Sequence, residues 1–387
     1  YSFTDEPRSE EWPALASAFA QLRARDPDHL PWNNLSGYSG YDSTFWVADN
    51  TGYLDAVHPA VLCNDHYDFR IGYDLGRFIA NVVGLRTWSR ARGIPFWAII
   101  QLVPHATVRQ LTEGELAWQV SMLLAYGARG VGYFTYWTPA PDLYLNWGPA
   151  IITYDGVRTA WYDIVARLNA RVLPAGETLA GLTWLSTQHA GSQPLGGQAF
   201  RGDDWVSTVT GRAAVGRFTD AAGVPYLVVV NSDSLAARTI TLTLVGASRV
   251  SRLAAARDDW RPVSVEPLAA GARVPLDLTA GEFALLRLED TFGGRVPRLG
   301  PTLAVVPSPA TGEVRFEMTR LAGRARLEVV DGAGRRIWSR EPPSGSASLM
   351  WRGERDSGGQ VPAGVYFARV TDARGTASRR WSWLGAR

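Results

Sequence analysis

The sequence contains no lysine and only one cysteine, and both shortages narrow what the chain can do. All 39 basic residues are arginine, and the 37 acidic residues reduce the net charge to +2. Because the arginines form no continuous stripe, we expect no binding to nucleic acid or to an acidic membrane. A single cysteine, Cys63, excludes an intramolecular disulfide. Without lysine, a phosphate-binding loop of the Gly-Lys type is excluded as well.

Metal-ligand spacings and long apolar runs are also missing. The five histidines lie far apart, and the sequence has neither a His-x-x-x-His pair nor paired cysteines. No stretch is apolar for long enough to span a bilayer. We therefore expect no metal, no cofactor and no membrane span. The 16 Trp and 14 Tyr, by contrast, are numerous, and such flat rings with polar tips suit the faces of sugars.

The first 172 residues alternate between strand-like and helix-like segments. Apolar runs predict strands, and helix-like periodicity, including a Thr112–Glu115 capping box, separates them. Strands that alternate with helices predict a parallel sheet. Five strands would be the C-terminal part of a (β/α)8 TIM barrel whose other strands precede residue 1, and a complete open α/β sheet is the alternative. The predicted strands are residues 1–6, 30–35, 61–64, 94–101 and 130–137.

After residue 172 the pattern changes to short alternating segments with turn signals. We expect a β-sandwich domain over residues 173–292, a Gly- and Pro-bearing linker over 293–301 and a second all-β module over 301–387. The predicted fold class is therefore α/β, with part of a TIM barrel followed by two all-β sandwich domains.

Carboxylates follow two of the predicted strands, at the ends where barrel enzymes place their chemistry. Asp5 and Glu6 end the first strand, and Asp65 ends the third. Glycoside hydrolysis needs an acid for the leaving oxygen and a second group for the sugar carbon. We expect Glu6 to be the acid, because burial and the neighbouring Asp5 raise the pKa of its carboxyl. Since adjacent strand residues face opposite ways, this pair requires a bend before Pro7.

Amide and aromatic side chains near the same strand ends are candidates for binding the sugar. Amides can hold sugar hydroxyls, and aromatic rings can stack on sugar faces, with Trp137 as our choice for that platform. Tyr144, Asn146 and Trp147 follow in the same loop as a candidate rim. The predicted substrate-binding residues are Asn33, Asn34, His66, Tyr67, Trp97, Gln101, Tyr136 and Trp137.

Two stretches resemble known glycosidases. Residues 123–137, LLAYGARGVGYFTYW, resemble the seventh helix and eighth strand of retaining barrel glycosidases such as family 42 β-galactosidases. The motif Asp5-Glu6-Pro7 is closer to family 123 N-acetylgalactosaminidases, which resemble family 20 hexosaminidases in using an adjacent Asp-Glu pair. These likenesses extend over about residues 1–170 and imply a glycoside hydrolase that is β-galactosidase-like or N-acetylhexosaminidase-like.

The sequence departs from the family 42 pattern at both catalytic positions. That family carries Asn before the acid/base Glu and a nucleophilic Glu at the end of strand seven, where this chain has Asp5 and Gln101. A carboxamide is too weak a nucleophile for that step. Three explanations stay open: the sugar's own 2-acetamido group attacks, oriented by Asp5; Asp65 is the base of an inverting reaction; or the barrel binds carbohydrate without cleaving it.

The C-terminal module resembles a different family. Residues 306–310, 351–353, 356–359 and 362–367 resemble FlgD-type immunoglobulin-like domains, and an unrelated sandwich is the alternative. Such domains often close secreted bacterial enzymes, where they serve in export or surface attachment. This resemblance implies a secreted or cell-surface bacterial protein with export or cell-surface machinery as a partner, and the glycosidase resemblance adds a carbohydrate substrate.

Overall fold

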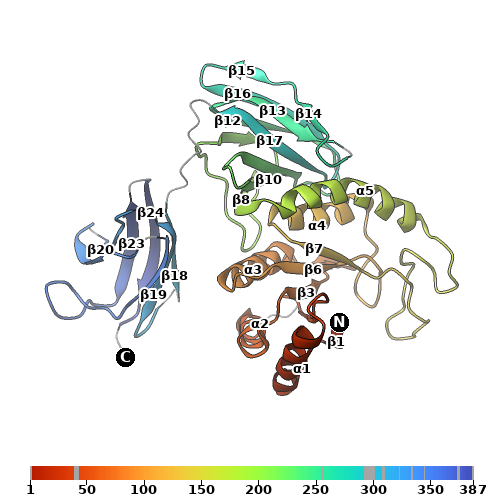
Figure 1. Cartoon of the computed structure of the whole chain (residues 1–387), viewed down its shortest axis with the longest axis horizontal. Helices are drawn as coiled ribbons and strands as arrows, with labels where there is room; N and C mark the ends of the chain where they lie inside the picture. Colours follow the sequence, from red (N-terminus) through yellow and green to blue (C-terminus); the bar gives the residue numbers. More distant parts are fainter. Residues whose placement is uncertain are drawn as a thin grey trace. The chain divides into compact units, whose positions relative to one another are not determined.

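The chain folds into two compact units, Tyr1–Val296 and Pro297–Arg387, in the computed structural model (Figure 1). Each unit has its own hydrophobic core. The predicted linker lies outside the described residues except for residue 301. The structure describes residues 2–38, 43–254, 256–291, 301–306, 310–321, 323–332, 334–343, 345–372 and 375–385.

A parallel sheet opens the first unit. All neighbouring strands are parallel, and their order in the sheet is their order in the chain, as in a (β/α)8 barrel. The five predicted strands are confirmed to within a few residues. Among the described residues β1 and β7 are the sheet edges, so the barrel is not closed there. The strands are β1 (Ser2–Asp5), β2 (Trp32–Ser36), β3 (Leu62–His66), β6 (Phe96–Gln101) and β7 (Gly130–Phe134).

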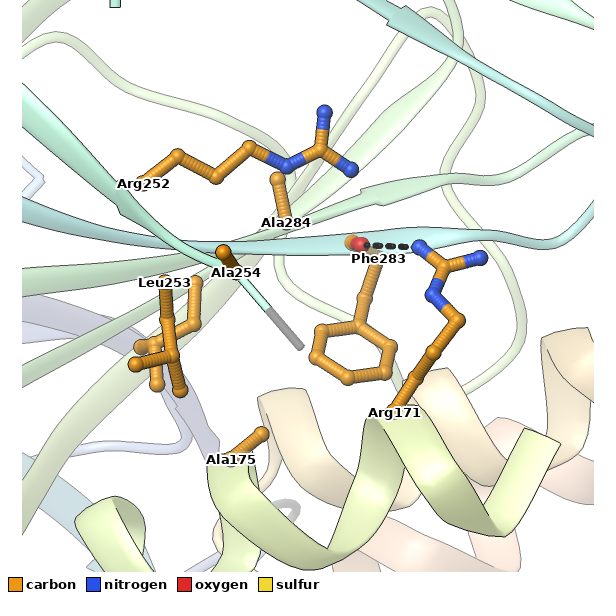
Figure 2. Close-up of a pocket in the computed structure, with 8 residues that line it drawn as sticks. Arg171, Ala175, Arg252, Leu253, Ala254, Phe283 and Ala284 are labelled. Carbon is orange, nitrogen blue, oxygen red and sulfur yellow. Dashed lines mark hydrogen bonds between the residues drawn. The ribbon is translucent and has the colours of Figure 1, made fainter. Parts of the chain in front are cut away.

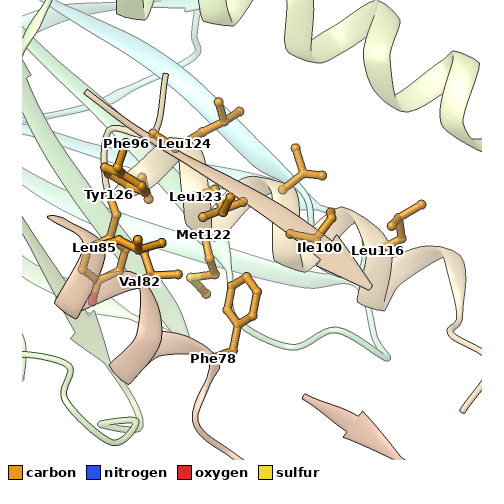
Figure 3. Close-up of a cluster of buried hydrophobic side chains, with 14 of the residues drawn as sticks. Phe78, Val82, Leu85, Phe96, Ile100, Leu116, Met122, Leu123, Leu124 and Tyr126 are labelled. Atoms are coloured by element: carbon orange, nitrogen blue, oxygen red, sulfur yellow. The ribbon is translucent and has the colours of Figure 1, made fainter. Parts of the chain in front are cut away.

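Helices follow these strands and pack against them. The predicted capping box is present, because Thr112 Oγ1 accepts from the Glu115 N–H and Glu115 Oε2 accepts from the Thr112 N–H. Phe78, Ile100 and Met122 belong to a core in which side chains of α3, β6 and α4 point toward one another (Figure 3). The helices are η1 (Ser9–Glu11), α1 (Trp12–Arg25), α2 (Ser43–Val57), α3 (Phe78–Ala91), α4 (Glu113–Ala125) and α5 (Ala160–Ala180), and a hairpin of β4 (Phe69–Arg70) and β5 (Tyr73–Asp74) follows β3.

None of the helices in the described part of the chain combines the length and the apolar character that crossing a membrane requires.

An antiparallel β-sandwich completes the first unit, as the sequence predicts. Its larger sheet has the order β14-β13-β17-β11-β10-β8, and its smaller sheet has the order β15-β16-β12-β9. The strands are β8 (Thr183–Ala190), β9 (Val206–Thr210), β10 (Ala213–Thr219), β11 (Pro225–Asn231), β12 (Arg238–Val245), β13 (Ala247–Leu253), β14 (Trp260–Pro262), β15 (Glu266–Leu268), β16 (Gly271–Leu278) and β17 (Phe283–Thr291).

The boundary expected at residue 172 falls inside α5. This helix continues to Ala180, and Pro174 and Leu179 near its end are buried. The larger sheet of the sandwich contributes Phe218 and Val228 to the same core as the parallel sheet. The α/β part and the sandwich therefore share apolar packing, and the change in sequence pattern does not separate two compact units.

The second unit is all-β, as expected. Its two sheets have the orders β18-β19-β22 and β21-β20-β23-β24. Aromatic rings dominate its core, where Phe316 lies 5.4 Å from Trp381 and Trp351 lies 5.1 Å from Trp383 between ring centroids. Part of the predicted FlgD-like motif, residues 307–309, lies outside the described residues. The strands are β18 (Thr302–Val306), β19 (Val314–Leu321), β20 (Arg326–Asp331), β21 (Arg336–Arg340), β22 (Gly345–Trp351), β23 (Gly364–Asp372) and β24 (Gly375–Trp383).

Candidate active site

Three predicted carboxylates meet at the carboxyl ends of β1, β2 and β3. Asp5 is the register partner of Asn34, and Ser36 is the register partner of Asp65. Asn34 Nδ2 donates to Asp5 Oδ1 at 3.0 Å. The Ser36 hydroxyl donates to Glu6. Because Asn34 and Ser36 are two residues apart on β2, they share a face of the sheet and hold the carboxylates on that face.

The backbone bends where the adjacent Asp5-Glu6 pair requires it. The pairing of β1 with β2 shifts register between Ser2 and Asp5. Glu6 has a φ of 44°, in the left-handed region that a residue with a side chain rarely adopts, and its N–H donates to the Asn34 carbonyl at 2.9 Å. Strained backbone of this kind concentrates at functional sites, so the bend itself supports a role for Glu6.

The environment of Glu6 favours its protonated form. Although the residue is exposed, partial desolvation raises the pKa of this carboxyl most, and the charge of Asp65 raises it further. The hydrogen bond from Ser36 opposes these effects, whereas the charges of Asp5 and Asp49 add to them. A carboxyl whose pKa is raised by desolvation and by like charges can act as a general acid near neutral pH.

The environment of Asp65 differs in its hydrogen bonds. Burial raises the pKa of the Asp65 carboxyl most; side-chain donors on Tyr67 and Asn34 lower it, the charge of Asp5 raises it, and the net shift is upward. Asp65 thus has two side-chain donors that stabilise its anion, and Glu6 has one. Because the two carboxyls repel when both are charged, the pair retains one proton to higher pH than an isolated carboxyl would.

An aromatic wall borders this carboxylate cluster. The ring of Tyr67 stacks on Phe134 at 5.4 Å between centroids and meets the edge of His105 at 5.6 Å. His105 in turn lies 4.7 Å from the ring of Trp147. Burial, followed by the charge of Asp65, raises the pKa of Tyr67, so its hydroxyl stays protonated and donates to that carboxylate.

His105 is the residue of this wall that sequence reasoning missed. Its Nδ1 donates to the Val103 carbonyl at 3.0 Å, which leaves Nε2 as an acceptor. Burial lowers the pKa of His105, so the imidazole is neutral at neutral pH. The sequence signal that could have identified His105 is its position in the loop that follows the strand ending at Gln101. A neutral imidazole with an acceptor nitrogen can bind a sugar hydroxyl.

Gln101 has its partners inside the protein. Its Oε1 accepts from the Phe69 N–H at 3.0 Å, and its Nε2 donates to the carbonyls of Phe69 and Arg109 at 3.1 and 2.9 Å. The side chain is completely buried. The structure therefore places Gln101 in the support of the loops after β3 and β6, and not among the groups around Asp65.

Asn33 and His66 also have hydrogen-bond partners within the protein and, unlike Asn34, do not face the carboxylates. Asn33 Nδ2 donates to the Thr4 carbonyl at 2.6 Å, and its Oδ1 accepts from the Tyr53 hydroxyl at 3.2 Å. His66 Nε2 lies 3.0 Å from Asp68 Oδ1, and both side chains are buried. These two predicted sugar-binding residues have structural partners on the side of the sheet away from Asp65.

The remaining predicted aromatics are Trp97 on β6 and the adjacent Tyr136 and Trp137 after β7. Trp97 of β6 packs edge-on against Trp32 of β2, with 5.8 Å between the ring centroids. Tyr136 and Trp137 follow β7 and are 54% and 49% exposed. Trp137 Nε1 donates to the Tyr154 carbonyl at 3.2 Å, which fixes the orientation of its ring. A fixed and exposed ring is suited to stacking, so Trp137 stays our predicted platform.

A small cavity elsewhere in this unit lies between α5 and the sandwich (Figure 2). Arg171 and Arg252 line it, and both donate to Glu282 Oε1. The candidate carboxylates do not line this cavity. Among the described residues, no three His, Cys, Asp or Glu side chains are arranged to hold a metal ion.

The buried Asp68 carboxylate beside His66 predicts a pH-dependent contribution to stability. Burial raises its pKa, but the hydrogen bond and charge of His66 and the N–H groups of Arg77 and Gly76 lower it more, and the net shift is downward. The charged Asp68 carboxylate therefore contributes its full stabilisation at pH values above the ordinary Asp pKa of about 3.9. This stabilisation is lost as the pH falls toward the lowered pKa that Asp68 has in the folded protein. We expect Asp68→Asn to reduce the free energy of unfolding by about 2 kcal/mol at pH 7.

Urea unfolding of the Asp68→Asn variant at pH 7 and at acid pH measures this effect. The exposed Asp155→Asn is the matched control and should change neither curve. An equal loss of stability at both pH values would show that the charge of Asp68 does not contribute.

No protein-family model and no curated protein matches this chain. Solved structures that resemble it include glycoside hydrolases. A rhamnosidase from Novosphingobium sp. PP1Y is 11% identical with a TM-score of 0.48, over 93% of this chain and 44% of that one. A family 51 α-L-arabinofuranosidase from Bifidobacterium longum is 13% identical with a TM-score of 0.36, over 74% of this chain and 66% of that one.

A β-galactosidase from the psychrophilic Marinomonas ef1 is 14% identical with a TM-score of 0.34, over 44% of this chain and 28% of that one. The chain spans less than half the length of the rhamnosidase. With identities and TM-scores this low, the chemistry of the site has to be argued from its own geometry.

Proposed function

We propose that the carboxylate cluster hydrolyses O-glycosidic bonds, with Glu6 as the general acid. The observation that carries this proposal is the bend at Glu6, which directs its carboxyl toward Ser36 and Asp65. A protonated carboxyl beside an anionic one is the pair that glycoside hydrolysis requires. Glu6 would protonate the leaving oxygen, and the negative charge of Asp65 would face the positive charge that develops on the sugar ring.

Asp5 and Asp65 offer two routes for the second half of the reaction. Asp65, held by Tyr67 and Asn34, could activate a water molecule for an inverting displacement. Asp5, which accepts from Asn34, could instead orient a 2-acetamido group of the sugar. The two routes differ in substrate and in stereochemistry, because only the acetamido route retains the anomeric configuration.

The test is hydrolysis of a panel of β-galactosides and β-N-acetylhexosaminides, with the first-formed anomer followed by proton NMR. We expect turnover to fall at least a hundredfold in the variant that removes the working carboxylate, Asp65→Asn for the inverting route or Asp5→Asn for the acetamido route. Retention on N-acetyl substrates alone would select Asp5, and inversion on either sugar would select Asp65.

A binding protein without activity is the competing function. It is favoured by the internal bonding of Gln101, at the strand end where a family 42 enzyme has its nucleophile. Sugar binding without turnover by any member of the panel would establish it and reject the hydrolase.

A further inference from the structure

Two loops, at the carboxyl ends of β3 and β7, carry large apolar side chains into solvent. Ile71 and Tyr73, in the hairpin after β3, are 63% and 59% exposed. Leu143 and Tyr144, in the loop after β7, are 100% and 92% exposed. We call these four residues the apolar rim. Surface hydrophobic residues are ordinary when single, but several on adjoining loops indicate a binding surface.

Backbone hydrogen bonds join these two loops through the loop after β6. The Ile71 N–H donates to the Thr107 carbonyl at 2.8 Å, which ties the hairpin to the loop after β6. The Ala106 N–H donates to the Leu145 carbonyl at 2.5 Å, which ties that loop to the one after β7. The rim residues are therefore held on one connected support.

Asp142 fixes the tip of the loop after β7. Its Oδ1 accepts from the N–H groups of both Tyr144 and Leu145 at 2.8 Å. The carbonyl of Asp142 also accepts from the Asn146 N–H at 2.9 Å. These bonds close a turn that presents Leu143 and Tyr144 outward, so their exposure follows from the local fold.

The aromatic wall connects the rim to the carboxylates. Trp147 belongs to the same loop as Tyr144 and contacts His105, whose ring meets the edge of Tyr67. Tyr67 donates its hydroxyl to Asp65. A ligand that reached from Asp65 along this wall would come to the rim next.

We infer that the apolar rim binds an aryl or alkyl aglycone of the glycoside whose sugar occupies the carboxylate cluster. This inference rests on the proposed function. Ile71 and Leu143 are aliphatic, and such side chains gain from contact with hydrocarbon but little from contact with sugar hydroxyls. The rings of Tyr73 and Tyr144 can pack on hydrocarbon as well as on a sugar face. The two aliphatic side chains therefore favour a glycoside with an apolar group.

The experiment compares octyl and methyl glycosides of galactose and of N-acetylglucosamine, with lactose and chitobiose as the sugar-extended counterparts. We expect the full chain to show a kcat/KM about tenfold higher for the octyl than for the methyl glycoside, because burial of the alkyl chain contributes to transition-state binding. A double variant, Ile71→Ser with Leu143→Ser, should lose most of this preference and keep its activity on the methyl glycoside.

Matched controls separate the rim from any exposed apolar residue. Leu173 and Leu235 are 66% and 72% exposed, on α5 and in the sandwich. A double variant with both replaced by Ser should leave the octyl preference unchanged. Equal kcat/KM for octyl and methyl glycosides would overturn the inference. A preference for lactose or chitobiose that the rim variant abolishes would also overturn it, since the rim would then be a sugar subsite.

A binding measurement keeps the inference testable if no glycoside is hydrolysed. Saturation-transfer NMR with the octyl glycosides, below the concentration at which they form micelles, reports which ligand protons touch the protein. Contact with the octyl protons that the rim variant removes would support the apolar site even when the hydrolase proposal fails. Absence of such contact in the unmodified chain would reject the apolar site.

Discussion

Replacing Glu6 with Gln is expected to lower kcat about a thousandfold for glycosides with poor leaving groups, such as methyl glycosides. A general acid contributes most where the leaving oxygen is basic and needs a proton. For 2,4-dinitrophenyl glycosides, whose leaving group departs as a stable anion, we expect a reduction of less than about tenfold. The dependence on leaving group follows from the role of general acid proposed for Glu6, and kcat across a leaving-group series measures it.

The pH profile gives a second view of the same residue. Glu6 donates only while protonated, so kcat/KM of the unmodified chain should fall as pH rises through the raised pKa of Glu6. Glu6→Gln removes that alkaline limb. Asp65→Asn removes a charge that raises the pKa of Glu6. The remaining activity of this variant should therefore begin to fall at a lower pH than that of the unmodified chain.

Glu10→Gln is the matched control for Glu6→Gln, because Glu10 is exposed and lies four residues further along the chain. It should leave both the leaving-group series and the pH profile unchanged. A loss of activity in Glu6→Gln that is equal for all leaving groups would contradict the role of acid and point to substrate binding. An unaffected rate would remove Glu6 from the mechanism.

The parallel sheet could be predicted from the sequence because its signals are local. The apolar run that forms Phe96–Gln101 and the capping box at Thr112 each specify one element by themselves. The end of the α/β part could not be predicted in the same way. α5 crosses residue 172 because its buried side chains, including Leu179, pack into a core that distant strands complete, and such packing leaves no mark in a short window.

The candidate site follows partly from the same local rule. The ends of neighbouring parallel strands lie together, so the order of the strands is enough to group Asp5, Glu6 and Asp65. Which of two adjacent amides faces them depends on the phase of the pleat, and the structure selects Asn34. His105 was missed because the path of its loop depends on contacts between distant segments.

The largest effect on stability is expected at Gly216, where the sandwich meets the α/β part. A Cβ on Gly216 of β10 would lie 2.3 Å from the carbonyl oxygen of Ala125, the last residue of α4. That oxygen accepts from Thr187 Oγ1 at 2.7 Å and from Trp184 Nε1 at 3.2 Å. Since the obstacle is backbone, an added methyl group must displace the end of α4 or β10 and strain both hydrogen bonds.

We expect Gly216→Ala to reduce the free energy of unfolding of the first unit by about 3 kcal/mol, the sum of overpacking and weakened buried hydrogen bonds. Gly216→Val should cost more or prevent folding. Gly176→Ala is the matched control: Gly176 lies within α5, nothing is within 4 Å of its added Cβ, and the helical position favours Ala by about 1 kcal/mol. In urea unfolding, Gly216→Ala should therefore lower the free energy of unfolding and Gly176→Ala should raise it. A Gly216→Ala variant as stable as the unmodified chain would mean that β10 does not approach α4 this closely, and that the sandwich and the α/β part do not share one core.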